Sequence, residues 1–157
     1  MYRKILVPLD GSKMAECVIS HIKNIVKSGD VTEIILFRVC EPPVVLADYP
    51  ADLRGKWEDH VKDETDHAIE LCSLYLGNAE KDLRKAGFKA TTQSGLGKPA
   101  EEIVNYAVQN GVDLIVMATH GRSGVSRWAF GSIADKVIRS SPVPVMLVRP
   151  EECQAEL

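Results

Sequence analysis

Short apolar runs with almost no polar alternation constrain the fold of this chain more than any other feature. Such runs cover Ile5–Leu9, Ile34–Val39, Asp113–Met117 and Val143–Val148. A run that is apolar at nearly every position is typical of a strand covered on both faces, as in a parallel sheet packed between helices. The weaker, polar segment Phe88–Ser94 predicts a fifth strand at a sheet edge.

Segments with helical spacing separate these runs. Apolar residues recur three and four positions apart over Met14–Val26, Leu53–Ala86 and Pro99–Val108, and Gly131–Ser132 begin a further helix. The Gly77-Asn78 pair is a place where the long second helix could kink or split. Strands that alternate with helices predict an α/β fold, a doubly wound five-stranded parallel sheet with helices on both faces.

Length and composition exclude several classes of protein. The 157 residues fit one domain, predicted over residues 1–150 with a polar tail at 151–157. A net charge of −3 argues against a nucleic-acid partner, and no apolar run approaches the roughly 20 residues that cross a membrane. The four cysteines lie far apart with no C-x-x-C spacing, which predicts reduced thiols in a cytoplasmic protein.

The segment that follows the Asp113–Met117 strand has the composition of an anion site. Glycines, cations and hydroxyl groups gather there: His120, Gly121, Arg122, Gly124, Ser126, Arg127, Gly131 and Ser132. Unpaired N–H groups at a helix start attract negative charge, and glycine lets a phosphate approach the main chain. The segment predicts phosphate binding. The structural alternative is a set of turns with Ser132 as a helix cap.

Asp10 follows the first strand, at an end of the sheet where ligands bind if the winding direction reverses there. If the first and fourth strands are neighbours, Asp10 faces the predicted phosphate site across one crevice. Its carboxylate suits a hydrogen bond to a ribose or base, or a metal beside phosphates. It could equally do no more than turn the chain.

The Gly95–Ala100 segment matches the G-x-G-x-x-A pattern of dinucleotide-binding proteins. The strand before it is the weakest in the chain, and Pro99 removes an N–H group from the helix start. The acidic residue expected about 20 positions on is replaced by Ala118 and Thr119. A tight turn before a helix is therefore the preferred interpretation.

Three histidines raise the question of a metal or catalytic site. His60 and His67 could approach one face of the long helix and bind a metal, although a solvated charged face fits the surrounding acids and lysines better. His120 could pair with Ser132, but no residue can be named to orient it. The sequence also has no P-loop and no nucleophile elbow. We therefore name no catalytic residue and no metal ligand.

The Val143–Val148 run is apolar although its place in the topology is an edge of the sheet. Exposed apolar edges aggregate unless they are covered, and pairing with the same strand of a second copy covers them. The run therefore predicts a two-fold homodimer, in which Pro144 occupies a position that needs no N–H donor.

The chain resembles the universal stress proteins from end to end. The resemblance lies in Ile5–Ser12, Gly97–Ile103, Met117–Ser132 and Pro142–Arg149. The ATP-binding branch of that family carries the pattern G-x2-G-x9-G-[ST]. Gly121 and Gly131 match the second and third glycines, Ser132 matches the last position, and Ala118 replaces the first glycine.

The resemblance implies an adenine nucleotide alpha hydrolase-like sheet of order 3-2-1-4-5, a homodimer through the last strand, and ATP, with Mg, in the crevice. The residues that it implies around adenine and ribose are Pro8, Leu9, Asp10 and Val39, with Ala118 near the ribose. Those that it implies at the phosphates are Gly121, Arg122, Gly131, Ser132 and Ile133. Met117, His120 and Gly124, from the same strand and loop, complete the predicted nucleotide-binding set.

The predicted function is that of a cytoplasmic, dimeric, ATP-binding regulatory protein of the stress response, with an unknown protein partner and at most slow ATP hydrolysis. One alternative is a dimeric interaction module that binds no nucleotide, which Ala118 favours. Another is an ATP-pyrophosphatase-like or adenylate-forming enzyme. Such enzymes usually place a glycine-rich loop after the first strand, and Asp10–Lys13 is poor in glycine.

Overall fold

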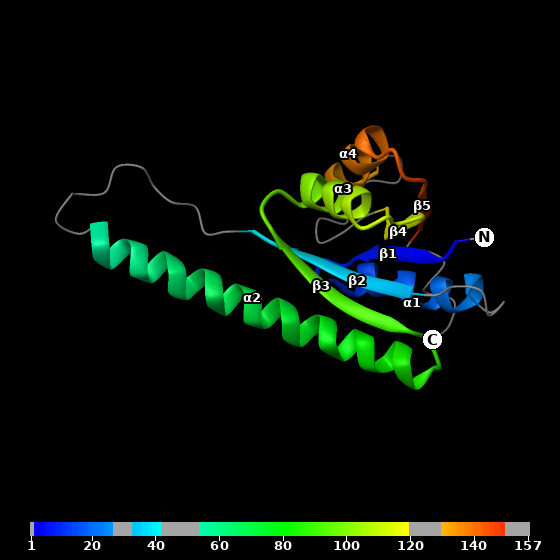
Figure 1. Cartoon of the computed structure of the whole chain (residues 1–157), viewed down its shortest axis with the longest axis horizontal. Coiled ribbons are helices and arrows are strands. Elements are labelled where there is room, and N and C mark those ends of the chain that lie inside the picture. The colour runs from blue at the N-terminus through cyan, green and yellow to red at the C-terminus, as the bar shows by residue number, and fades with distance from the viewer. Residues whose placement is uncertain (1, 27–32, 42–53, 120–129, 150–157) are drawn as a thin grey trace.

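Strands and helices alternate along the whole described chain (Figure 1). The computed structural model describes residues 2–26, 33–41, 54–119 and 130–149. The elements, in chain order, are β1 (Lys4–Pro8), α1 (Lys13–Ile25), β2 (Glu33–Cys40), α2 (Arg54–Lys85), β3 (Ala90–Leu96), α3 (Pro99–Gln109), β4 (Leu114–Ala118), α4 (Ser132–Ser140) and β5 (Val145–Val148). The predicted tail at 151–157 lies outside the described residues.

The five strands form one parallel sheet of order β3-β2-β1-β4-β5, which confirms the predicted fold class and strand order. The central strand is β1, where Leu6 is in register with Ile35 of β2 on one side and Ile115 of β4 on the other. The chain winds outward from β1 to β3, then returns to the other side of β1 for β4 and β5. The winding direction therefore reverses between β1 and β4.

Helices cover both faces of the sheet, because strand residues are apolar on both sides. Successive side chains of a strand point to opposite faces. Ile5 and Val7 pack under α1 and α2, whereas Leu6, between them, packs under α3 and α4. The continuous apolar runs thus serve two separate cores, one on each face.

The predicted strand ranges differ from the observed ones by one or two residues, and the two starts that are displaced by two residues have local reasons. The third strand covers Ala90–Leu96 instead of Phe88–Ser94, because the backbone N–H of Phe88 donates to the carbonyl of Leu83 and closes the end of α2. The fifth strand begins at Val145 instead of Val143, whose N–H donates to the hydroxyl of Ser141 in a turn. In both cases a nearby acceptor takes a donor that the sheet would otherwise use.

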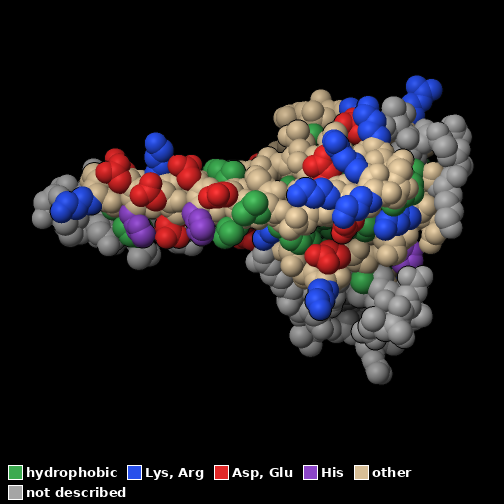
Figure 2. All heavy atoms as spheres, turned by 90° about the horizontal axis from the view of Figure 1, so that it is seen from below, with side chains coloured by type: hydrophobic (Ala, Val, Ile, Leu, Met, Phe, Trp, Pro, Cys, Tyr) green, Lys and Arg blue, Asp and Glu red, His purple; other side chains and the backbone are tan. Residues whose placement is uncertain are grey.

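The second helix is continuous over 32 residues, so the kink considered at Gly77 does not occur. A glycine within a helix costs about 0.5–1 kcal/mol relative to alanine, which a helix of this length tolerates. The amino-terminal part of α2 projects beyond the sheet (Figure 1). Acidic and histidine side chains line this projecting part in the space-filling view (Figure 2). Only its carboxyl-terminal part packs on the core, through Leu76 and Leu83.

Candidate functional site

A cavity of about 440 Å³ lies at the carboxyl ends of β1, β2 and β4. This is the edge of the sheet where the winding direction reverses, the usual ligand site of such folds. Nine of the thirteen predicted nucleotide-binding residues line it: Pro8, Leu9, Asp10, Val39, Met117, Ala118, Gly131, Ser132 and Ile133. The other four, His120, Gly121, Arg122 and Gly124, lie outside the described residues.

The turn after β1 holds Asp10 in a fixed position. The backbone N–H of Leu9 donates to the carbonyl of Phe37 at 2.8 Å, which ties the strand end to β2. One carboxylate oxygen of Asp10 accepts the N–H of Ser12 at 2.9 Å, and the Ser12 hydroxyl in turn caps α1 through the N–H of Ala15. Asp10 therefore turns the chain and also lines the cavity, so the two roles considered for it are compatible.

The start of α4 presents unpaired backbone donors to the same cavity. Gly131 is the cap residue of α4, and its position offers no side-chain cap for the first turn. Ser132 is the first helical residue, so it does not have the capping role considered for it. The cavity wall includes Gly131, Ser132, Ile133 and Ala134, which together form the first turn. The N–H groups and dipole of this helix start favour a bound anion.

Ala118 occupies the place of the first glycine in the family pattern, and it is the last residue of β4, in register with Val148. A strand residue has extended backbone, which alanine adopts without strain. The difference between alanine and glycine here is therefore one methyl group on the cavity wall. The Ala118 side chain packs with the core on the α1 and α2 side of the sheet.

Arg38, the one cation among the described residues that line the cavity, was not predicted as a site residue. Its guanidinium carbon lies 4.9 Å from the ring centroid of Tyr75, in cation–π contact. The guanidinium also lies so close to Gly11 that a Cβ there would be 3.1 Å from it, and Gly11 has a φ of +86°. A cation inside the apolar run Ile34–Val39 was the signal that could have identified it.

Tyr75 supports Arg38 from α2 and is itself a neutral phenol at physiological pH. Burial raises the pKa of Tyr75, and the negative charge of Glu16 raises it further, whereas Arg38 acts in the opposite direction. The wall formed by β2 and α2 therefore presents one positive charge, on Arg38, supported by an uncharged ring.

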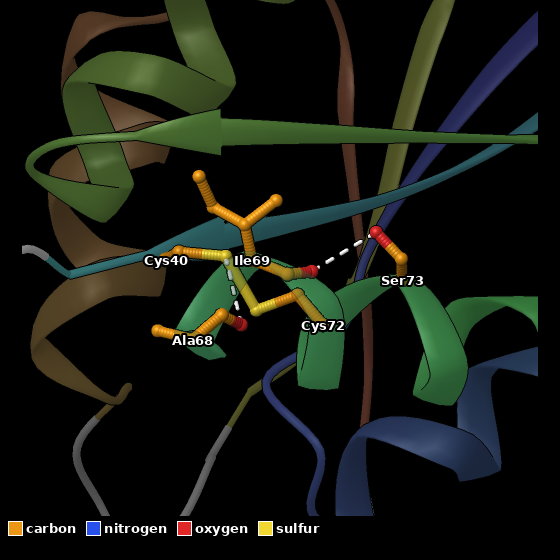
Figure 3. Close-up of a disulfide and its surroundings, with 5 residues drawn as sticks. All are labelled: Cys40, Ala68, Ile69, Cys72 and Ser73. Carbon is orange, nitrogen blue, oxygen red and sulfur yellow. Dashed lines mark hydrogen bonds between the residues drawn. A yellow bond between two sulfur atoms is a disulfide. The ribbon is translucent and has the colours of Figure 1, made fainter. Parts of the chain in front are cut away.

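The α2 side of the cavity contains a disulfide that was not predicted. Cys40, the last residue of β2, is bonded to Cys72 of α2 (Figure 3). Both line the cavity, together with Ala68 and Leu71. The expectation that the thiols are all reduced is therefore wrong for this pair. This pairing could not be predicted from the sequence, because the two residues are 32 positions apart and meet only when α2 packs beside β2.

The Gly95–Gly97 turn has a structural explanation, as preferred above. A Cβ at Gly95 would lie 3.0 Å from the Phe37 ring, and Gly97 has a φ of +142° beside the Glu102 side chain. The N–H of Gly97 donates to the carbonyl of Cys40, which fixes the turn against the end of β2. Both glycines are required by close packing and backbone conformation.

The described residues contain no cluster of three His, Cys, Asp or Glu side chains arranged to hold a metal ion. His60 contacts the Trp57 ring, with centroids 5.7 Å apart, on the projecting part of α2. None of the helices in residues 2–26, 33–41, 54–119 and 130–149 is both long enough and apolar enough to cross a membrane. The cavity combines the backbone donors of the α4 start and the cation Arg38, which suit an anionic group, with two carboxylates, Asp10 and Glu41.

Comparison with known proteins gives a consistent result. The family model described as the universal stress protein family matches residues 1–149. Universal stress protein MJ0577 of Methanocaldococcus jannaschii is 32% identical over 156 residues, which cover 95% of this chain and 96% of the relative. Universal stress protein YxiE of Bacillus subtilis is 32% identical, with 95% of this chain and all of the relative covered.

Solved structures have the same fold. The structure of MJ0577 superposes with a TM-score of 0.80 at 32% identity, covering 95% of this chain and 96% of its own. A universal stress protein family member from Arabidopsis thaliana with AMP bound has a TM-score of 0.60 at 17% identity, covering 94% and 91%. A universal stress protein in complex with cAMP has a TM-score of 0.56 at 18% identity, covering 95% and 98%. The sheet described above is thus of the adenine nucleotide alpha hydrolase-like type.

Proposed function

The chain belongs to the universal stress protein family, and on that premise we propose that it is a regulatory protein that binds ATP as a ligand. The nucleotide occupies the cavity at the ends of β1, β2 and β4. The observation that carries the proposal is that the turn after β1 and the start of α4, far apart in sequence, line one cavity. A volume of about 440 Å³ lies within the range of small-molecule sites, about 300–1,000 Å³.

Each wall of the cavity suits one part of the nucleotide. Pro8, Leu9 and Val39 offer apolar surface for the base, and Asp10 offers a carboxylate for a ribose hydroxyl. The start of α4 offers backbone N–H groups for the phosphates. Two relatives with bound nucleotides, one AMP and one cAMP, support an adenine nucleotide as the ligand class.

A magnesium ion would enter together with the phosphates. Mg²⁺ keeps several waters and is usually held by substrate phosphates and one or two carboxylates. Asp10 and Glu41 are the carboxylates on the cavity wall. Because Asp10 is proposed at the ribose hydroxyl, the phosphates and water would supply most of the ligands of the ion.

The proposal is a binding function rather than a catalytic one. The described residues that line the cavity include no histidine that could activate Ser132 as a nucleophile. Slow hydrolysis is the most that we assign. We further propose that the protein acts as a homodimer in the cytoplasm, with β5 of each copy at the interface. The strand is short, lies at the sheet edge and leaves Met146 37% exposed.

A nucleotide-free interaction module is the competing function, because Ala118 departs from the family pattern. Alanine places a methyl group where the ATP-binding branch has only a hydrogen. The extended backbone of Ala118 means that the substitution adds volume without strain. We therefore favour retained binding. Replacement of Ala118 by glycine should then change the affinity for MgATP by no more than about threefold, well under 1.4 kcal/mol.

A nucleotide panel tests the proposal. The thermal unfolding midpoint of nucleotide-stripped protein is measured with ATP, ADP, AMP, cAMP and GTP, each with and without Mg²⁺. A ligand at 100 times its dissociation constant adds about 2.7 kcal/mol of stability, or roughly 5–10 °C for a domain of this size. We expect the largest shift with MgATP and none with GTP. If none of the five nucleotides raises the midpoint above that of the ligand-free protein, the interaction module is favoured.

A further inference from the structure

Cys40 and Cys72, which form a disulfide (Figure 3), both line the cavity. The disulfide joins the last residue of β2 to the middle of α2, at a Cα–Cα distance of 6.9 Å. The residue before Cys40 is Val39, which faces the cavity at the predicted base position. A change in this bond therefore acts directly on the surface that meets the ligand.

The bond also lies where α2 leaves the body of the protein. Among the described side chains of α2, Cys72, Leu76 and Leu83 are the buried ones, and Cys72 is the nearest of them to the amino terminus. Leu71, beside it, is 51% exposed, and the helix before it projects beyond the sheet (Figure 1). The disulfide is therefore the attachment of α2 to β2 that lies nearest the projecting part of the helix, while Tyr75, Leu76 and Leu83 hold the rest of α2 on the core.

The structure accommodates the reduced state as well. The carbonyl oxygen of Ala68 lies 3.9 Å from the Cys40 sulfur, in the position of an acceptor for a thiol (Figure 3). Reduction therefore leaves the Cys40 thiol with a hydrogen-bond partner. The two cysteines are only 3% and 5% exposed, and both border the cavity, so the cavity is the route by which a small thiol reaches them.

We propose that Cys40 and Cys72 are a redox-active pair that controls this wall of the cavity. In the oxidised state the disulfide fastens α2 to β2 and holds the wall in the shape that binds the ligand. In the reduced state α2 is released near Cys72 and the ligand binds more weakly. A bound ligand in turn shields the disulfide from reduction. The effect on affinity rests on the proposed nucleotide function, whereas the pair and its effect on α2 do not.

The reaction is thiol–disulfide exchange with a dithiol reductant. A thiolate of the reductant attacks one sulfur of the Cys40–Cys72 bond, forms a mixed disulfide and releases the other cysteine as a thiolate. The second thiol of the reductant then displaces the protein sulfur and closes the reductant into its own disulfide. Two electrons pass to the protein, and the two cysteine thiolates take up two protons.

The experiment uses the full chain with Cys17→Ser and Cys153→Ser, so that Cys40 and Cys72 are the remaining thiols. The protein is oxidised with diamide or reduced with dithiothreitol, and thiols are counted by alkylation under denaturing conditions. Hydrogen exchange of α2 and the dissociation constant for MgATP are measured in both states. The matched control is the same chain with Cys40→Ala and Cys72→Ala, which has no bond to break.

We expect no free thiols in the oxidised protein and two after reduction. Exchange of the α2 amides around Cys72 should be faster in the reduced protein. The reduced protein should also bind MgATP at least about fivefold more weakly than the oxidised protein, which is the lower end of typical coupling between sites. The double alanine variant should behave as the reduced protein in either condition. MgATP should slow reduction of the wild-type pair severalfold.

Two results would overturn the proposal that the pair controls α2. Thiols that stay free after oxidation would show that the pair forms no disulfide in solution. Equal amide exchange in the two states would show that the bond does not hold α2. If neither state binds MgATP, the nucleotide function fails instead, and hydrogen exchange still decides whether the pair controls α2. Equal MgATP affinities in both states would refute the coupling to the ligand.

Discussion

The backbone N–H of Gly131 donates to the carbonyl oxygen of Thr119 at 2.6 Å. This hydrogen bond joins the residue that follows β4 to the cap residue of α4. Thr119 and Gly131 both line the cavity. The start of α4 is thus held beside the end of β4, where an anion would meet its unpaired N–H groups.

Gly131 is the first place to test this arrangement. In Gly131→Val, the branched side chain occupies space at the helix start and keeps phosphate away from the backbone donors. We expect affinity for MgATP to fall at least tenfold, or about 1.4 kcal/mol. Calorimetric titration measures it, with Gly77→Ala as the control, because a Cβ at Gly77 meets nothing within 4 Å. Wild-type affinity in Gly131→Val would show that α4 does not bind the phosphates.

The Asp10→Asn variant separates the two roles of Asp10. The amide oxygen still accepts the N–H of Ser12, so the turn before α1 and the unfolding midpoint should be nearly unchanged. The lost charge should weaken MgATP binding by about 1.5–3 kcal/mol, the usual contribution of a hydrogen bond to a charged group. If both the midpoint and the affinity stay at wild-type values, Asp10 serves the turn alone.

Asp113 stabilises the amino terminus in a pH-dependent way. Its carboxylate accepts the backbone N–H groups of Arg3 and Lys4, each at 2.9 Å. These two bonds, Lys4 first, lower the pKa of Asp113. The stabilisation is therefore complete above the ordinary aspartate pKa of about 3.9 and is lost as the pH falls through the lower folded-state value.

We expect Asp113→Ala to lower the free energy of unfolding by about 1 kcal/mol at pH 7. The difference from wild type should narrow below pH 4, as the native carboxylate becomes protonated. Urea unfolding at pH 7 and pH 3 measures both values. Asp82→Ala is the control, since the Asp82 carboxylate is 71% exposed and lies 3.9 Å from Lys85. A loss that is the same at both pH values would mean that the charge of Asp113 is not involved.

The β5 edge predicts how the protein assembles. A lysine at Met146 puts a charge on the exposed edge strand, a change that blocks pairing between strands. Light scattering after size exclusion should give the dimer mass for wild type and the monomer mass for Met146→Lys. The control is Val108→Lys, on α3, where the valine is 53% exposed. If the Met146→Lys protein is still a dimer, the interface does not depend on β5.

The parts of the fold that follow from apolar periodicity were predicted correctly. Apolar runs such as Ile5–Leu9 predicted the buried strands, because a strand of a parallel sheet between helices has few polar positions. The predicted starts of β3 and β5 were wrong by two residues, since Phe88 and Val143 donate to local acceptors that periodicity does not reveal. Local hydrogen bonds, rather than burial, decide those boundaries.

Site residues beside the end of one element could be predicted from the sequence, whereas those that depend on contact between two elements could not. Asp10 and Gly131 each follow or precede an element whose end the sequence marks. Arg38 belongs to the cavity because β2 turns it toward Tyr75 of α2, and the Cys40–Cys72 bond depends on the same packing. Contacts between β2 and α2 require the position of the long helix, which no local pattern supplies.

Calorimetric titration of nucleotide-stripped, oxidised protein with MgATP tests the central claim most directly, with the nucleotide recovered and analysed over the following hours. If the protein binds ATP as a ligand, we expect saturable binding with a dissociation constant in the micromolar range or below, and recovery of nearly all the ATP intact. Absence of binding heat, together with an unchanged unfolding midpoint, would contradict this claim and leave a dimeric interaction module. Rapid conversion to AMP and pyrophosphate would contradict it in the other direction and make the protein an enzyme.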